Sequence, residues 1–154
     1  MSDAAGGLTV RLARREDVAR LATLLAGGTI RGAEGPADLA SYEGAFDEIA
    51  ATPGSEVLVA EAGGAVVGMC QLVVFRHLQE RGGLCAEIES VHVEAGRRGG
   101  GVGAVLVEAA VERAAGAGCY RVQLTSDKSR VEAHRFYVRL GFTASHEGFK
   151  KYLK

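Results

Sequence analysis

A seven-residue loop at positions 97–103, Arg-Arg-Gly-Gly-Gly-Val-Gly, carries the strongest chemical pattern in the chain. It lies between an alternating, β-branched stretch at 87–93, which predicts a strand, and an Ala-, Val- and Leu-rich stretch that predicts a helix. Unpaired N–H groups at a helix N-terminus, together with the helix dipole, favour a phosphate. Glycines let the backbone approach such a ligand, and an arginine adds a charged hydrogen bond. The pattern therefore predicts a phosphate-binding loop.

Three kinds of phosphate loop compete for this segment. A Walker loop needs Lys-Ser or Lys-Thr after its glycines, and neither pair follows them here. A dinucleotide fingerprint, Gly-x-Gly-x-x-Ala, fits residues 99–104, but only 50 residues follow Ala104, too few for the rest of a dinucleotide-binding domain. The third pattern, Arg-x-x-Gly-x-Gly, is matched by residues 98–103.

Two carboxylates precede the loop on the predicted strand. Glu87 and Glu89 are two positions apart, so a regular strand presents both on the same side. A carboxylate pair in that position can move protons, and it can also be a pair of solvent-exposed side chains on a half-exposed strand. The sequence leaves both interpretations open.

Further strands and helices must hold these residues in place. Alternating stretches predict strands, amphipathic stretches predict helices, and Gly and Pro clusters predict turns. The expected strands are 8–13, 57–60, 65–75, 83–93, 120–125 and one after Phe142; the expected helices begin near residues 18, 39, 102 and 126–129. Ser126 or Ser129 is expected to cap the last helix, and segments 29–38 and 76–83 are expected to be loops.

The element order βααβββαβαβ predicts one α+β domain over residues 1–154. Its central sheet should be mixed but mostly antiparallel, with helices flanking it. Parallel pairing of strand 83–93 with strand 120–125 would splay the fourth and fifth strands apart and leave a crevice for a ligand.

Composition excludes several classes of function. A net charge of −1 provides no field to hold nucleic acid, and no 18-residue apolar run could span a membrane. Residues 1–7 lack the basic and apolar regions of a secretory signal. The three separated cysteines indicate buried thiols in a reducing, cytoplasmic compartment, and the four histidines show no ligand spacing, so no metal site is expected.

A second motif lies 30 residues beyond the loop, at 133–142: Ala-His-Arg-Phe-Tyr-Val-Arg-Leu-Gly-Phe. It resembles the late signature of the GCN5-related N-acetyltransferases (GNAT), Ala-x-x-Phe-Tyr-x-x-x-Gly-Phe. The loop at 98–103 resembles the pyrophosphate loop of the same family. Together with the order of elements, the resemblance covers residues 8–153.

The resemblance implies acetyl-coenzyme A as co-substrate and direct transfer of its acetyl group to a primary amine. In this family the strand before the loop carries a bulge, and its backbone pairs with the pantetheine arm and polarises the thioester carbonyl. Carried over, the coenzyme-binding residues are Val91, His92, Val93, Arg98, Gly99, Gly100, Gly101, Val102, Gly103 and Ala104. Glu89 or Glu87 would deprotonate the amine, with Glu89 the first choice, and Tyr137 would protonate the leaving thiolate.

The chain departs from the family pattern in two places. Glu94-Ala-Gly-Arg97 replaces the frequent His-Pro-Asp-Tyr, and Asp127 and Ser129 stand where an Asn is frequent, which leaves a coenzyme contact on that side open. The acceptor is expected to be a small-molecule or peptide amine. The segments expected to line its site, 29–38, 76–83 and 145–149, carry mixed charges that select neither a polycation nor a polyanion. A homodimer is expected, as is common in the family, and a non-catalytic, acetyl-coenzyme A-binding regulatory module is the alternative function.

Overall fold

The computed structural model of the chain describes residues 3–4, 7–28, 35 and 38–154. Most of the predicted loop 29–38 therefore lies outside the described residues. The chain divides into two compact units, residues 1–123 and residues 124–154. The sheet belongs to the first unit.

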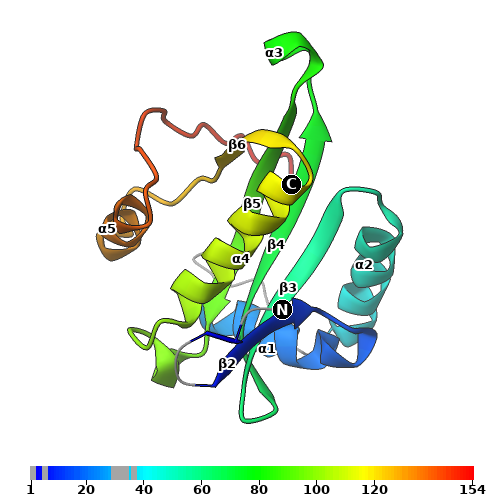
Figure 1. Ribbon diagram of the computed structural model, residues 1–154. Coiled ribbons are helices and arrows are strands. Elements are labelled where there is room, and N and C mark those ends of the chain that lie inside the picture. Colours follow the sequence, from blue (N-terminus) through cyan, green and yellow to red (C-terminus); the bar gives the residue numbers. More distant parts are fainter. Residues whose placement is uncertain (1–2, 5–6, 29–34, 36–37) are drawn as a thin grey trace. The chain divides into compact units, whose positions relative to one another are not determined.

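Six strands form one sheet in the order in which they follow along the chain (Figure 1). They are β1 (Asp3–Ala4), β2 (Leu8–Leu12), β3 (Ser55–Ala62), β4 (Ala65–Arg76), β5 (Leu84–Val93) and β6 (Cys119–Gln123). All neighbours are antiparallel except β5 and β6, which are parallel. This confirms the predicted α+β class and its mixed, mostly antiparallel sheet; the two-residue β1 was not expected.

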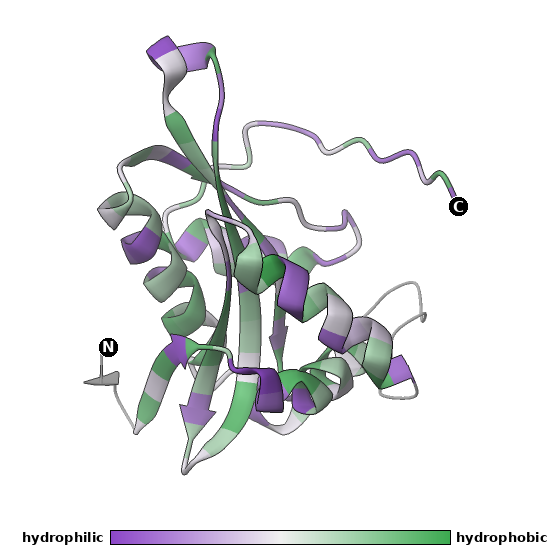
Figure 2. Ribbon diagram, turned by 90° about the vertical axis from the view of Figure 1, so that its right-hand side faces the viewer, coloured by the Kyte–Doolittle hydropathy of each residue, from purple (hydrophilic) through white to green (hydrophobic). Residues whose placement is uncertain are grey.

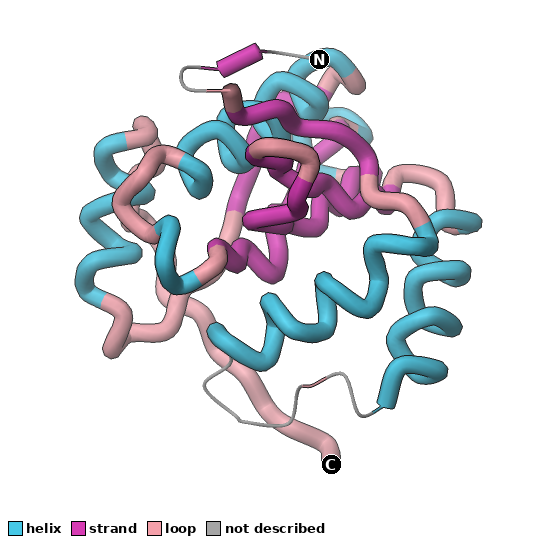
Figure 3. Tube along the Cα trace, turned by 90° about the horizontal axis from the view of Figure 1, so that it is seen from below, coloured by secondary structure: helices cyan, strands magenta, loops and turns pink. Residues whose placement is uncertain are grey.

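Helices cover both faces of the sheet (Figure 3). On one face, Leu21 and Leu24 of α1 (Val18–Gly28) pack into a cluster with β3 and β4 residues, against which α2 (Leu39–Ala51) also packs. The other face packs against α4 (Val102–Gly116). Strands covered on both faces are hydrophobic along their length rather than alternating, and Figure 2 shows hydrophobic residues concentrated along these strands.

The packing of α4 depends on small residues. A Cβ at Gly68 of β4 would lie 2.8 Å from Val102 and 2.9 Å from Leu106, so glycine permits the close approach of helix and sheet. The buried residues of α4 are Val102, Leu106, Val107, Ala110 and Ala114. Val105 and Ala109, which were expected on this face, are only half-buried. The buried stripe recurs every four residues and therefore lies slightly to one side of the predicted one.

The connection between β4 and β5 is not entirely a loop. It contains a short helical turn, α3 (Gln79–Gly82), inside the segment 76–83 that was predicted to be irregular. Glu80 and Arg81 adopt positive φ angles of 51° and 58°. The turn is therefore a strained, left-handed connection rather than a regular helix.

The unit 124–154 contains one helix, α5 (Val131–Arg139). The expected Ser caps are wrong: Arg130 is the N-cap residue, and the Ser129 hydroxyl instead donates to Asp127 Oδ1 at 2.6 Å. The expected strand after Phe142 is also wrong, since residues 142–154 form no strand. This segment is exposed and rich in lysine, and Gly148 interrupts it, so it lacks the paired, half-buried surface that sustains a strand.

No helix in the described part of the chain combines the length and the apolar character needed to cross a bilayer.

Candidate functional site

β5 carries a bulge at the position that the family resemblance implies. Met69 pairs with His92 and Gln71 pairs with Glu89, so two steps along β4 correspond to three steps along β5. Ser90 lies inside this interval with φ of 53°, a left-handed conformation that is rare for a residue other than glycine. The bulge interrupts the backbone ladder with β4 immediately before residues 91–93.

The other edge of β5 is open along the same stretch. The parallel pairing with β6 ends at Glu87 and Gln123, whereas β5 continues to Val93. Residues 88–93 therefore have no β6 partner, which confirms the predicted splay between these two strands. An unpaired strand edge can accept an extended ligand by backbone hydrogen bonding.

The Gly-rich loop leads directly from this edge into α4. Gly99 and Gly101 have φ of 83° and 87°, and no atom lies within 4 Å of the place where a Cβ would be at either one. The N-cap residue is Gly101, which offers no side-chain cap, and the Val105 N–H is bonded to the Gly101 carbonyl. The loop therefore presents uncapped N–H groups of the first helical turn beside open space.

Arg98 adds a positive charge to the loop. Its Nη2 donates to the Gly27 carbonyl at 3.2 Å and its Nε donates to the Val93 carbonyl at 3.4 Å, contacts that join the loop to α1 and β5. Glu94 pairs with Arg20 at 2.7 Å and with Arg97 at 3.2 Å. Among the described residues Arg98 has no such carboxylate partner, so its charge is available for an anion.

The register of β4 and β5 places the two carboxylates on one face of the sheet. Glu87 pairs with Val73 and Glu89 pairs with Gln71, which is two positions from Met69 on the α1–α2 side. Glu87 is half-buried and Glu89 is exposed. Beyond the bulge, His92 returns to this face, because a Cβ at Gly28 of α1 would lie 2.2 Å from its ring.

Gln123 of β6 links two side chains on the carboxylate face. Its Nε2 donates to Glu87 Oε2 at 3.0 Å, and its Oε1 accepts from the Cys85 thiol at 3.7 Å. These two contacts fix which end of the amide faces Glu87. The sequence analysis did not single out Gln123, although its alternation with Arg121 in a predicted strand would have placed both on one face.

Aromatic and cationic side chains continue this face toward the start of β5. Tyr120 and His77 are joined by a hydrogen bond of 2.8 Å between the phenol oxygen and Nε2. Arg121 lies with its Cζ 5.4 Å from the Tyr120 ring centroid. His77 lies in the segment 76–83 that was expected to line the acceptor site, whereas Tyr120 and Arg121 were not predicted, because their proximity to it depends on the β5–β6 register.

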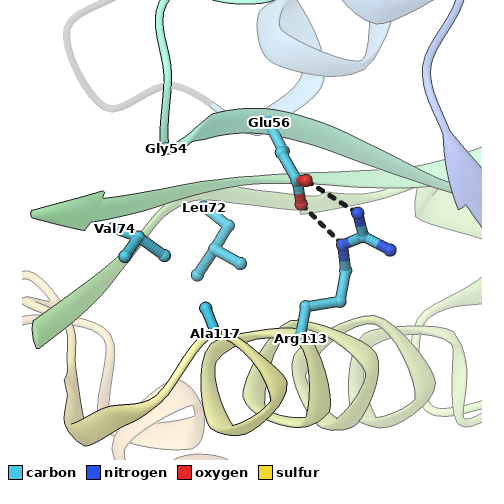
Figure 4. A pocket seen from close by; sticks show the side chains of 6 residues that line it. All are labelled: Gly54, Glu56, Leu72, Val74, Arg113 and Ala117. Atoms are coloured by element: carbon cyan, nitrogen blue, oxygen red, sulfur yellow. Dashed lines mark hydrogen bonds and ion pairs between the residues drawn. The ribbon is translucent and has the colours of Figure 1, made fainter. Parts of the chain in front are cut away.

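A cavity of about 360 Å³ lies on the opposite face of the sheet (Figure 4). Leu72 and Val74 line it, and both belong to the face that packs on α4. Arg113 of α4 makes a bidentate ion pair with Glu56, with N···O distances of 2.5 and 2.7 Å, and this hydrogen bonding lowers the pKa of Glu56. The cavity is therefore separate from the carboxylate face.

Tyr137 lies on α5, in the unit 124–154. Its ring makes edge contacts with Phe136 and Phe142, with centroid distances of 5.0 and 5.8 Å. In the same unit the Ser129 N–H and hydroxyl donate to Asp127, which lowers the pKa of that carboxyl. Of the predicted residues, the carboxylates, the bulge and the Gly-rich loop follow one another along β5 and into α4, all within residues 1–123. No cluster of three potential metal ligands occurs among the described residues.

Comparisons with known proteins agree with the family resemblance of the two sequence motifs. The profile of the Acetyltransferase (GNAT) family matches residues 28–142. The aminoalkylphosphonate N-acetyltransferase of Salmonella typhimurium is 33% identical over 116 residues, which is 75% of each protein. Glucosamine 6-phosphate N-acetyltransferase 1 of Oryza sativa subsp. japonica is 35% identical over 105 residues, 66% of this chain and 62% of that protein.

A solved structure, described as a transcriptional regulator from Bacillus halodurans C-125, is 40% identical with a TM-score of 0.91. The match covers 95% of this chain and 99% of that one. Sequence profile, curated relatives and fold agree, and the chain belongs to the acetyltransferase (GNAT) family as an acetyl-coenzyme A-dependent N-acetyltransferase.

Proposed function

We propose that this chain acetylates the primary amine of a small molecule by direct attack in a ternary complex, with residues 1–154 acting as one catalytic domain. One observation carries the proposal: β5 combines a bulge and an open edge with two carboxylates just before them and the Gly-rich loop just after them. Coenzyme binding and proton removal would thus be arranged along a single strand.

The residues present fit acetyl-coenzyme A. The open edge of β5 offers the backbone of Val91, His92 and Val93 to the pantetheine arm. The seven residues from Arg98 to Ala104 would hold the pyrophosphate through the uncapped start of α4, and Arg98 would add its unpaired charge. The coenzyme supplies the activated acetyl group, and the bulge would direct a backbone N–H at its carbonyl oxygen.

Glu87 and Glu89 would supply the base. Both face the same side of the sheet, and an acceptor ammonium must lose a proton before its nitrogen can form the new amide bond. Tyr137 would donate a proton to the departing coenzyme A sulfur, so that the proton removed from the amine is balanced by one delivered to the thiolate.

The acceptor class is proposed from the curated relatives. One is named for an aminoalkylphosphonate and the other for glucosamine 6-phosphate, so both names describe an amine that also carries a phosphorus oxyanion. We propose an acceptor of this class for the present chain. A regulatory role alongside catalysis is the second candidate, and the likeness to the Bacillus halodurans regulator favours it.

A homodimer is also proposed. β6 is the last strand of the sheet, and none of the described strands pairs with its outer edge. Exposed strand edges are common sites of symmetric pairing. Light scattering at micromolar concentration would give twice the chain mass, and a monomeric mass would refute the dimer.

Thiol release from acetyl-coenzyme A tests the proposed function. The amine panel should contain aminoalkylphosphonates, amino sugar phosphates, polyamines, aminoglycosides, amino acids and peptides. We expect thiol release above background only with amines, and fastest with those that carry a phosphonate or phosphate. The Glu87→Gln/Glu89→Gln double variant is the control: it should still bind acetyl-coenzyme A but release thiol much more slowly. Silence across the whole panel would overturn the proposed acceptor chemistry.

A further inference from the structure

Arg121 lies on the same face of the sheet as the proposed base. It pairs with Cys85 across the parallel β5–β6 ladder, and Gln123 pairs with Glu87 two positions further on. Residues two apart on a strand share a face and are separated by about 7 Å. A cation on β6 and a carboxylate on β5 thus share one face of the sheet, with the amide of Gln123 beside the carboxylate.

An aromatic platform orients Arg121. Its Cζ lies 5.4 Å from the Tyr120 ring centroid, within cation–π range. Tyr120 is fixed in turn by His77, through the 2.8 Å hydrogen bond and a ring–ring distance of 5.5 Å, and Phe75 meets His77 edge-on at 6.1 Å. The Tyr120 ring also lies tightly against Gly83, where a Cβ would approach it to 2.9 Å. The Tyr120 ring therefore offers the exposed guanidinium a surface on which to stack.

The charge of Arg121 is not neutralised by an ion pair. Arginines 11, 15, 20, 97, 113 and 135 each make a carboxylate ion pair, but Arg121 makes none among the described residues. The Cys85 sulfur, and to a smaller extent the charge of Glu80, raise the pKa of Arg121. An exposed, oriented and unpaired guanidinium is suited to a planar, bidentate contact with an oxyanion.

We propose that Arg121, presented on the Tyr120–His77 platform, binds the phosphonate or phosphate of the acceptor while the acceptor amine lies at Glu87. The inference rests on the proposed function, and it assigns an anion subsite to residues that no family motif contains. The spacing suits an acceptor whose amine and oxyanion are a few carbons apart. A polyamine or an uncharged amine would leave the guanidinium without a partner.

The test compares two acceptors in the wild type, in two Arg121 variants and in one control variant. The acceptors are 2-aminoethylphosphonate, which carries an oxyanion, and propylamine, which does not. Arg121→Gln should raise KM for the phosphonate about 10-fold or more and leave kcat/KM for propylamine unchanged. Arg121→Lys keeps the positive charge but loses the paired N–H donors of the guanidinium. Its KM for the phosphonate should lie between those of the wild type and Arg121→Gln. Arg15→Gln removes another exposed arginine, one that pairs with Asp47 of α2, and should change the kinetics with neither acceptor.

Each outcome separates the subsite from the proposed function. Acetylation of neither amine would refute the proposed function, whereas equal use of both by the wild type would refute the acceptor class. A strong phosphonate preference that survives in both Arg121 variants would refute the subsite alone. The acetyl-coenzyme A thermal shift of each variant verifies its fold. If Arg121→Gln loses that shift, the acceptor ratio in Arg121→Lys decides the question.

Discussion

Gln123 donates a hydrogen bond to Glu87 across the parallel pair of β5 and β6, with 3.0 Å between Nε2 and Oε2. The amide cannot turn over without losing its contact with the Cys85 thiol as well. Glu87 is therefore held in one orientation by a neighbouring strand, whereas Glu89 stands exposed just before the bulge.

Loss of this hydrogen bond should slow the chemical step. We expect Gln123→Met, which keeps the side-chain length, to lower kcat ~10-fold because a misplaced base transfers a proton poorly. The rise in melting temperature caused by acetyl-coenzyme A should be unchanged, since Gln123 lies on β6 beside Glu87 and is not part of the Gly-rich loop. Gln79→Met, a matched change at an exposed position of α3, should have no effect. An undiminished kcat in Gln123→Met would show that Glu87 needs no such support.

The pH dependence of the rate should show which of Glu87 and Glu89 acts as the base. A base assists only while the acceptor amine is still protonated, so the variant lacking the base should fall furthest behind the wild type below the amine pKa and converge with it at high pH. The measurement is the rate of acetylation against pH for Glu87→Gln and Glu89→Gln, each with acetyl-coenzyme A saturating. The variant whose rate deficit is largest below the amine pKa and vanishes at high pH identifies the base. If neither variant behaves in this way, the proposed acid–base scheme is wrong.

Gly101 should be essential for coenzyme binding and not only for the fold. Acetyl-coenzyme A at one hundred times its dissociation constant should stabilise the protein by ~2.7 kcal/mol. Gly101→Val should abolish this gain, because its β-branched side chain would fill the open space above the loop. Gly118→Val is the control, since Gly118 has a similar φ of 91° and equally open surroundings but lies after α4.

Both substitutions should lower the melting temperature through backbone strain, and only Gly101→Val should lose the ligand-induced rise. NADH should give no rise in the wild type. A full acetyl-coenzyme A shift in Gly101→Val would place the pyrophosphate elsewhere.

The sequence predicted those parts of the site that lie along one strand and one loop. Alternation placed Glu87 and Glu89 on one face, and the glycine pattern located the loop that precedes α4 and the start of that helix. It did not predict Gln123 or Arg121 as site residues, because their position depends on a parallel register between segments that are distant in the sequence.

Local sequence patterns gave wrong predictions where the structure of a segment depends on contacts with other residues. Residues 142–154 contain aromatic residues typical of a strand, yet they form none, because a strand needs a paired neighbour. Ser129 is a good capping residue by type, but its hydroxyl is already bonded to Asp127. On α4 the predicted stripe shares Val102, Leu106 and Ala110 with the buried face, but it also included Val105 and Ala109, which are only half-buried.

Substitution of Tyr137 should affect the reaction differently from substitution of the carboxylates. Tyr137→Phe removes one hydroxyl and keeps the ring contacts with Phe136 and Phe142. We expect stability and acetyl-coenzyme A binding to survive and kcat to fall ~10²-fold, the lower end for a lost general acid. Tyr152→Phe removes a hydroxyl elsewhere in the same unit and should retain full activity. A full rate in Tyr137→Phe would exclude it as the proton donor.

Asp17 should stabilise the fold in a pH-dependent way. Its carboxylate accepts two hydrogen bonds from Arg11, at 2.7 and 3.0 Å, and one from the Arg14 N–H at 2.7 Å. These contacts lower its pKa in the folded protein. The stabilisation is therefore complete above the unfolded pKa of about 3.9 and is lost as the pH falls toward the folded pKa.

Asp17→Asn should cost roughly 2–3 kcal/mol at pH 7, because Arg11 is nearly buried and loses a charged partner. Urea unfolding at pH 7 and at pH 3 should show the gap between variant and wild type narrowing at the lower pH. Glu56→Gln breaks the more exposed pair with Arg113 and should cost less, ~1 kcal/mol or below, with the same direction of pH dependence. A gap for Asp17→Asn that stayed constant between the two pH values would mean that the ion pair does not account for its effect.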